Sequence, residues 1–144
     1  MQTSQFSDAS PRAGDGGRSA ARLWTGRVLS GIAVLFLTFD FAVKLLQLPS
    51  TVDIMAQLGY PASVIVPLGF VEIACLVVYL VPRTAPLGAV LWTGYLGGAM
   101  ATHVRVGNPL VSHVLFPIYI AALIWGGLWL RDARVRQLLG SRRG

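Results

Sequence analysis

Four long runs of mainly apolar residues constrain this chain more than any other feature of its sequence. A helix needs about 20 such residues to cross a bilayer. Backbone amides that face lipid must be hydrogen-bonded within their own segment, which excludes an open sheet of strands. We therefore predict an all-α fold, a four-transmembrane-helix antiparallel bundle. Its spans lie at roughly 25–46, 63–81, 85–105 and 112–130.

The composition places this bundle in a lipid bilayer. Hydrophobic residues make up 54% of the 144 residues and charged residues only 12%, whereas soluble domains carry about 25% charged residues. One domain of this length could not bury so much apolar surface in water. The net charge is +6, but the arginines gather at the ends of the apolar runs. We therefore expect lipid, and no nucleic acid, as the partner of this surface.

The basic residues also predict how the chain is oriented. Cytoplasmic loops of membrane proteins are enriched in lysine and arginine. Ten basic residues lie on the side of the two termini, and only Lys44 and Arg105 lie on the other. Both termini are therefore expected in the cytoplasm. The corresponding organisation is a disordered cytoplasmic tail at 1–22, a membrane domain at 23–131 and a basic cytoplasmic tail at 132–144.

The first connection on the outer side has a helical pattern of its own. Ser50 can cap a short helix, with Asp53 in its first turn and Gly59 at its end. Prolines at positions 49 and 61 bracket this segment. We predict a short helix that lies on the outer membrane interface, either as a plain connector or as the cover of a cavity.

Glu72 stands near the middle of the second apolar run. A charged side chain there costs at least about 2.5–3.5 kcal/mol on insertion scales, so we expect it to face the bundle interior. On a helical wheel it shares a face with Ile65, Leu76 and Tyr79. Two interpretations follow. Glu72 is either a proton relay, ion site or ligand hydrogen bond, or a structural hydrogen bond or ion pair between helices.

Other charged residues fall in the outer half of the predicted bundle. Asp40 and Lys44 are four residues apart on the first span, acid first, which favours a mutual salt bridge. A role in binding substrate is the alternative. Arg105, at the outer end of the third span, is expected to face inward and to be available to Asp40. With Glu72 below them, these residues predict a polar pocket that opens on the outer side.

Small residues form a stripe on the third span. Gly94, Gly98 and Ala101 fall, together with Arg105, within a sector of about 60° on a helical wheel. Two glycines four residues apart let helices approach closely. We therefore predict that this stripe packs against another helix.

Two histidines, His103 and His113, flank the third connection. A pair of histidines can bind a metal or haem, but no carboxylate or cysteine accompanies these two at a known ligand spacing. An interfacial position or a local hydrogen bond is favoured. We predict no metal site and keep His103 among the candidates for the polar pocket.

The third span also resembles a known family. The run from Gly94 to Arg105, GYLGGAMATHVR, closely resembles a signature of DoxX-like membrane proteins. Weaker matches extend the resemblance over about residues 26–139, at Lys44-Leu45, Leu58-Gly59-Tyr60-Pro61, Glu72, Val81-Pro82-Arg83-Thr84 and Trp125-Gly126-Gly127. The resemblance implies a multi-pass, four-helix protein of the bacterial cytoplasmic (inner) membrane. It makes Glu72, His103 and Arg105 candidate site residues.

The resemblance also suggests a redox role, because DoxX is named after a subunit of a thiosulfate:quinone oxidoreductase. We expect an accessory membrane subunit of a quinone-linked redox system rather than a stand-alone enzyme. A pocket with an acid, a histidine and aromatic residues can hydrogen-bond the oxygens of a quinone. The alternatives are a small proton-coupled transporter and a non-enzymatic scaffold or assembly factor that binds a membrane protein or a second copy of itself.

Overall fold

The computed structural model describes residues 14–140, and over this range the protein is helical apart from short connections. The elements in chain order are α1 (Gly14–Leu45), α2 (Pro49–Gln57), a 3₁₀ turn (Ala62–Val64), α3 (Ile65–Leu80), α4 (Ala85–Arg105), a π-helical turn (Leu110–Val114), α5 (Phe116–Arg131) and α6 (Ala133–Gly140). The prediction of an all-α fold is confirmed.

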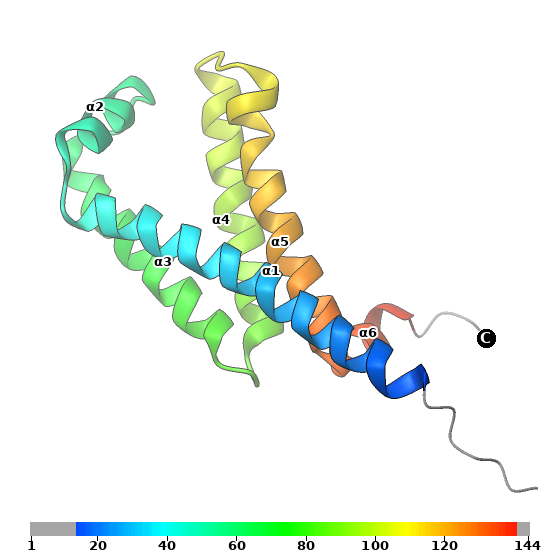
Figure 1. Ribbon diagram of the computed structural model, residues 1–144. Coiled ribbons are helices and arrows are strands. Elements are labelled where there is room, and N and C mark those ends of the chain that lie inside the picture. The colour runs from blue at the N-terminus through cyan, green and yellow to red at the C-terminus, as the bar shows by residue number, and fades with distance from the viewer. Residues whose placement is uncertain (1–13, 141–144) are drawn as a thin grey trace, which may run out of the picture.

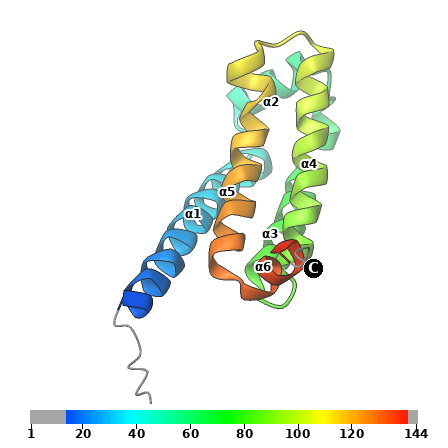
Figure 2. The ribbon, with the colours of Figure 1, turned by 90° about the vertical axis from the view of Figure 1, so that its right-hand side faces the viewer.

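The four long helices pack into a bundle (Figures 1 and 2). α1 lies against α3 and α5, and α4 lies against the same two helices. The start of α1, the α3–α4 connection and α6 lie at one end of the molecule. The short helix α2 and the α4–α5 connection lie at the opposite end, where α1 and α3 diverge from α4 and α5.

Three helical segments within residues 14–140 are long and apolar enough to cross a membrane: Ser19–Leu45, Ala62–Leu80 and Leu110–Arg131. They correspond to the first, second and fourth predicted spans. α4 has the predicted bounds and 21 residues, but its glycines, threonines and aromatic residues make it less apolar than the other three. The bundle thus contains three candidate spans, with α4 packed between two of them.

Helical structure extends into both of the segments predicted as tails. α1 begins at Gly14, so the segment 14–22 is helical rather than irregular, and residues 1–13 lie outside the described range. The physical reason is that extending an already formed helix costs far less than starting one. At the other end, α6 occupies much of the predicted basic tail. The sequence signal for α6 is Asp132, whose Oδ1 accepts a hydrogen bond from the backbone N–H of Arg134 at 2.9 Å and so caps the helix.

Close approach of helices occurs at other glycines than those predicted. A Cβ added to Gly127 on α5 would lie 2.8 Å from the backbone nitrogen of Ser30 on α1, and one added to Gly26 would lie 2.9 Å from Leu130 Cβ. By contrast, a Cβ on Gly94 or Gly98 would meet nothing within 4 Å among the described residues. No helix within residues 14–140 therefore packs closely against Gly94 or Gly98, where the sequence predicted a contact with another helix.

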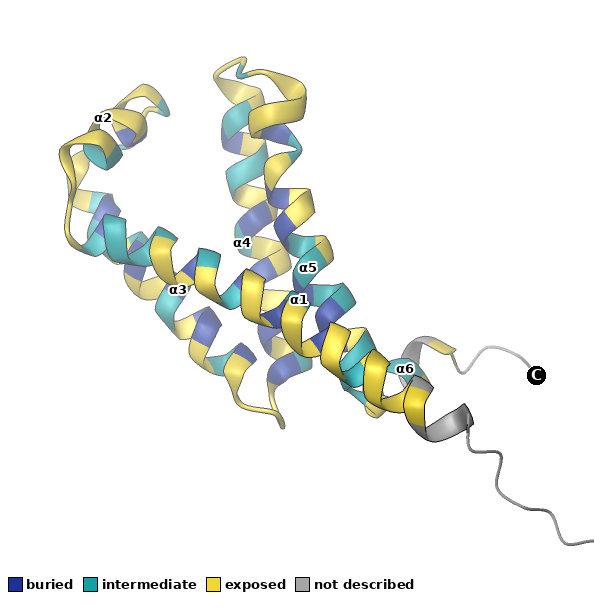
Figure 3. Ribbon diagram, in the orientation of Figure 1, coloured by how far each residue is buried: buried dark blue, intermediate teal, exposed yellow. Residues whose placement is uncertain are grey.

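The core lies on the inward faces of the long helices (Figure 3). The largest of its fully buried side chains include Leu37 on α1, Tyr79 on α3, Trp92 on α4, and Ile124 and Leu128 on α5. These apolar and aromatic side chains belong to one core cluster in the interior of the bundle. The outward positions of the same helices carry exposed leucine, isoleucine, valine and phenylalanine, as expected for helices whose outer surface meets lipid.

The short helix in the first connection exists, but it starts two residues earlier than predicted. Leu48 occupies the N-cap position and Pro49 the first helical position, where its missing N–H costs no hydrogen bond. The prediction of a Ser50 cap is wrong for this reason. Gly59 lies just beyond the helix with φ +79°, a left-handed conformation that favours glycine at helix ends. At the other end of α2, Gln47 is also left-handed, with φ +46°.

Candidate functional site

A cavity of about 470 Å³ lies between α1, α2, α4 and α5. Its lining residues come from the end of the bundle that carries α2, where α1 and α3 diverge from α4 and α5 (Figure 1). Most of its wall is apolar: Phe36 and Leu37 from α1, Ile54, Met55 and Leu58 from α2 and its end, Leu96 and Ala99 from α4, and Phe116, Pro117 and Ile120 from α5. The polar groups on the wall are few, and the most buried of them come from α1 and α4.

Asp40 and Lys44 are the charged residues on this wall, and the more buried of the two is Lys44. Its Nζ donates to Asp40 Oδ2 at 2.7 Å, one turn earlier on α1, and to Glu72 Oε1 on α3. The exposed fractions of the three side chains are 10% for Lys44, 35% for Asp40 and 0% for Glu72. The predicted salt bridge between Asp40 and Lys44 is thus present. The second salt bridge, between Lys44 and Glu72, depends on the registry of two helices. Residue spacing within one helix could not predict it.

Glu72 faces the interior, as predicted, with Ile65, Leu76 and Tyr79 buried on the same face of α3. It lies behind the cavity wall rather than on it. Its Oε1 also accepts a hydrogen bond from the hydroxyl of Tyr95 on α4, which does line the cavity. Lys44 and Tyr95 therefore stand between Glu72 and the cavity, one from α1 and one from α4.

The sequence reasoning missed the aromatic and hydroxyl groups of this site. Tyr95, Ala99 and Thr102 recur at the helical spacing i, i+4 and i+7, and all three line the cavity. Thr102 Oγ1 lies 2.9 Å from the hydroxyl of Tyr60, at the end of the α2 connection. The helical spacing of Tyr95 and Thr102 on the third span is the signal that could have identified them as a polar face.

Arg105 has a different partner from the one predicted. Its Nη2 donates to the backbone oxygen of Leu58 at 2.6 Å, and its guanidinium lies beside Gly59. Asp40 is instead satisfied by Lys44 one helical turn away. The prediction that Arg105 serves Asp40 is wrong, because α2 places its own C-terminal carbonyl in front of the arginine. Together with the Tyr60–Thr102 bond, this contact ties the α2 segment to α4.

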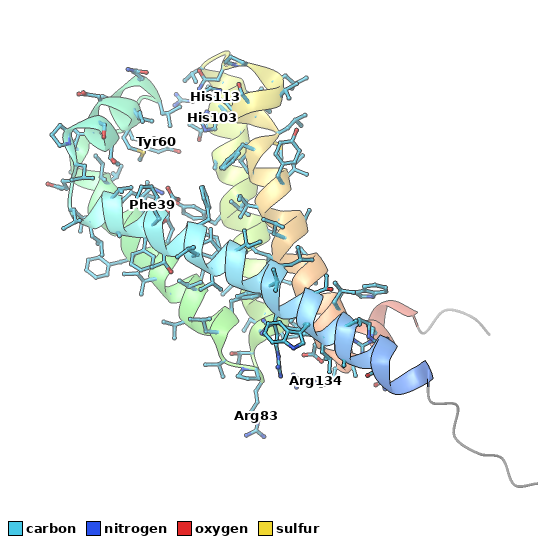
Figure 4. The ribbon with its side chains drawn as sticks, in the orientation of Figure 1. Phe39, Tyr60, Arg83, His103, His113 and Arg134 are labelled. Carbon is cyan, nitrogen blue, oxygen red and sulfur yellow. The ribbon has the colours of Figure 1, made fainter. Side chains whose placement is uncertain are left out.

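His103 and His113 lie side by side at the end of the bundle that carries the α4–α5 connection (Figure 4). Their ring centroids are 5.7 Å apart, and the rings meet edge to face at 64°. His103 Nδ1 pairs with the Asn108 side chain and His113 Nδ1 with the Ser112 hydroxyl, both at 2.8 Å. His103 also lines the cavity. In the described part of the chain, no three His, Cys, Asp or Glu residues come together as a metal site.

Comparison with known proteins identifies the family. Residues 28–127 match the DoxX-like family, which is more than half of the chain. The protein belongs to the DoxX-like family. The match includes Asp40, Lys44, Glu72 and Tyr95, so the buried polar cluster and the cavity wall lie within the DoxX-like region. No curated protein and no solved structure matches the chain. With its apolar helices, this chain is a membrane protein of the DoxX-like family.

Proposed function

We propose that this DoxX-like protein crosses the bacterial inner membrane four times, with both termini in the cytoplasm, and binds a quinone in the cavity of its outer half. The bound quinone links it to a redox system as an accessory membrane subunit. The observation that carries the ligand assignment is the position of Lys44, a buried cation facing an otherwise mainly apolar cavity.

The fourth crossing is α4. Its 21 residues rise about 30 Å, the thickness of the hydrocarbon core. It packs against α3 and α5, both candidate spans, and the connection from α3 is only a few residues long. A helix that is packed between two membrane-spanning helices in this way spans the membrane with them. The arginine-rich ends then fall on the side of α6 and the α3–α4 connection, which the positive-inside rule assigns to the cytoplasm.

The topology can be tested with single cysteines, because Cys75 is the only natural one and is buried. In a Cys75→Ala background, a cysteine replacing Arg83 should react with a membrane-impermeant maleimide only in inverted vesicles. A cysteine replacing Asn108 should react only in right-side-out vesicles. Reaction of both from the same side would contradict the four-span topology.

One N–H donor of the Lys44 ammonium is available to bind a ligand. An ammonium group carries three N–H donors, and two of them are used by Asp40 and Glu72. The third has no protein acceptor within residues 14–140. A buried donor of this kind stabilises an acceptor oxygen placed in the cavity. The Asp40 carboxylate beside Lys44 already balances its charge and disfavours an anion, so a neutral carbonyl is the better partner.

The residues present fit a quinone. The volume of about 470 Å³ falls within the range of roughly 300–1,000 Å³ of small-molecule sites. Phe36 and Phe116 supply an aromatic edge-to-face pair at 5.3 Å on one wall, and Tyr95 lines the cavity from α4. Lys44 supplies the donor for a ring carbonyl. A bound quinone would supply electron transfer, while the protein holds the ring and excludes water around the oxygen next to Lys44.

The test is the quinone content of protein purified from native membranes, measured by solvent extraction and mass spectrometry. The wild-type protein should retain quinone, and Lys44→Met should retain at least about tenfold less, because a hydrogen bond to a charged group contributes about 1.5–3 kcal/mol. Arg83→Met, which removes a positive charge at the other end of the bundle, is the matched control and should retain the wild-type amount. Ala99→Leu, which fills the cavity without touching the cluster, should also lower the content.

Other outcomes would favour the other functions. A stoichiometric membrane protein partner without quinone would favour a scaffold or assembly factor. Uptake of a substrate into proteoliposomes that is lost in Glu72→Gln would favour a proton-coupled transporter. Equal quinone content in wild type and Lys44→Met would contradict the proposed site.

A further inference from the structure

The two carboxyl oxygens of Glu72 have very unequal surroundings. Both donors that reach this side chain, the Lys44 ammonium and the Tyr95 hydroxyl, converge on Oε1. Oε2 is buried and has no hydrogen-bond partner among the described residues. A carboxylate needs donors at both oxygens, and a buried one left without them is costly. A protonated Oε2 is also left unpaired, but it is a neutral O–H donor, and burying an unpaired neutral group costs less than burying an unpaired charge.

The charges of the cluster also favour the protonated form of Glu72. Asp40, Lys44 and Glu72 would carry a net charge of −1 if all three were ionised. The side chain of Glu72 is fully buried, and that of Lys44 is nearly so, which makes an unbalanced charge expensive in this low-dielectric position. One proton on the cluster makes it neutral. Asp40, the most exposed of the three, is the better site for the remaining negative charge.

We propose that Glu72 is a proton-binding site that holds a proton on Oε2, while the Lys44 ammonium is paired with the Asp40 carboxylate. This inference stands apart from the quinone proposal, since it needs no ligand. Lys44 bonds to both acids, so it connects the buried Glu72 to the partly exposed Asp40. Loss of the proton breaks the Oε2–H bond and leaves a carboxylate with the proton passed to water.

The groups that face Glu72 are few. α1 contributes Lys44 and Asp40, α4 contributes Tyr95, and the next titratable group on α3 itself is the buried Cys75. Lys44 favours the ionised form of Glu72, and Asp40 opposes it. The proton state of Glu72 therefore depends on Asp40 in a way that a substitution can test.

The composition allows the protonation state of Glu72 to be measured directly. Glu72 is the only glutamate and Lys44 the only lysine in the 144 residues. Cell-free protein labelled with ¹³Cδ-glutamate and ¹⁵Nζ-lysine, reconstituted in nanodiscs without quinone, gives one NMR signal for each group. At neutral pH, the Glu72 signal should lie at the chemical shift of a carboxylic acid and the Lys44 signal at that of an ammonium. A carboxylate shift for Glu72 in the wild type would overturn the proposal.

The Asp40→Asn variant tests the charge argument. With Asp40 neutral, Glu72 becomes the only acid left to balance the Lys44 ammonium, so its signal should move to the carboxylate position. Asp53→Asn, an exposed acid on α2, is the matched control and should leave the signal in place. An unchanged acid signal in Asp40→Asn would contradict the balanced cluster. Since the wild-type spectrum involves no substitution, misfolding of a variant cannot hide the main result.

Discussion

Gly88 on α4 lies against Tyr79 on α3 so closely that a Cβ at position 88 would be 2.7 Å from the Tyr79 Cβ and nearer still to its backbone. The contact fixes the hairpin formed by α3 and α4, and therefore the position of Tyr95 relative to Glu72. Glu72 on α3 and Tyr95 on α4 both lie on the cavity side of this contact. The geometry of the site thus depends on a glycine at the other end of the hairpin.

Gly88→Ala should destabilise the bundle by about 1–3 kcal/mol, because the added methyl group forces the two helices apart. Gly97→Ala is the matched control on the same helix, where an added Cβ meets nothing within 4 Å in the described structure. It should be neutral or stabilising by up to about 1 kcal/mol, since alanine is the better helix former. Thermal unfolding in detergent measures both. Equal stability of the two variants would contradict the close α3–α4 contact.

Glu72→Gln should cost less than about 1 kcal/mol in unfolding free energy, because an amide has the shape of a neutral carboxyl and its Oε1 still accepts both donors. Lys44→Met should cost about 2 kcal/mol or more, since it leaves Asp40 without its cation. Equilibrium unfolding in mixed micelles compares the two. If Glu72→Gln is as damaging as Lys44→Met, Glu72 is a charged member of the cluster and not its neutral one.

The attachment of α6 should depend on pH through Asp132. Hydrogen bonds from Arg134 hold the pKa of this carboxyl below its usual value of about 3.9, and Arg134 also donates to the Pro82 oxygen at 2.6 Å. Because the pKa in the folded state is lowered, the stabilisation is present above the unfolded value and is lost as the pH falls through the folded one. α6 should therefore stay attached at neutral pH and detach only below about pH 4.

Spin labels at positions 84 and 137, in the Cys75→Ala background, report this detachment as a broadened distance distribution. Asp132→Asn should show the broadened distribution already at neutral pH. A wild-type distribution that first broadens between pH 5 and 7 would indicate another titrating group and contradict the assignment to Asp132.

The cover formed by α2 should loosen when its two links to α4 are removed. Tyr60→Phe removes the hydrogen bond to Thr102, and Arg105→Met removes the one to the Leu58 oxygen. Each bond contributes about 0.5–1.5 kcal/mol, so the double variant should populate an open position of α2. Spin labels at positions 57 and 101 measure it, with Asp53→Asn as the control on the same helix. An unchanged distance in the double variant would show that other contacts hold α2.

The sequence predicted the elements better than their contacts. The bounds of α4 and the inward direction of Glu72 follow from periodicity, and the Asp40–Lys44 pair follows from a spacing of one turn. Contacts between helices require their relative rotation and registry, which no spacing within one helix contains. This is why the pairing of Lys44 with Glu72 and the hydroxyl of Tyr95 were not predicted.

The small-residue stripe is a case in which the spacing predicted a helix contact that the described part of the structure does not have. Gly94 and Gly98 have the spacing of a packing motif, yet they line the cavity, and the close contacts occur at Gly26, Gly88 and Gly127. Small residues make room either for a neighbouring helix or for a cavity, and sequence alone does not distinguish the two. Here the missing side chains on α4 enlarge the space opposite Lys44.

The most direct test of the account is the affinity of the purified protein in nanodiscs for a short-chain ubiquinone, measured by quenching of tryptophan fluorescence. Trp92 is a suitable reporter, because it is fully buried and its ring lies 5.6 Å from that of Tyr95 on the cavity wall. Quenching should saturate in the wild type and in Arg83→Met with similar Kd. Lys44→Met should raise the Kd at least about tenfold. Absence of saturable quenching in the wild type, or the same Kd in Lys44→Met, would contradict the proposal that the cavity binds quinone through Lys44.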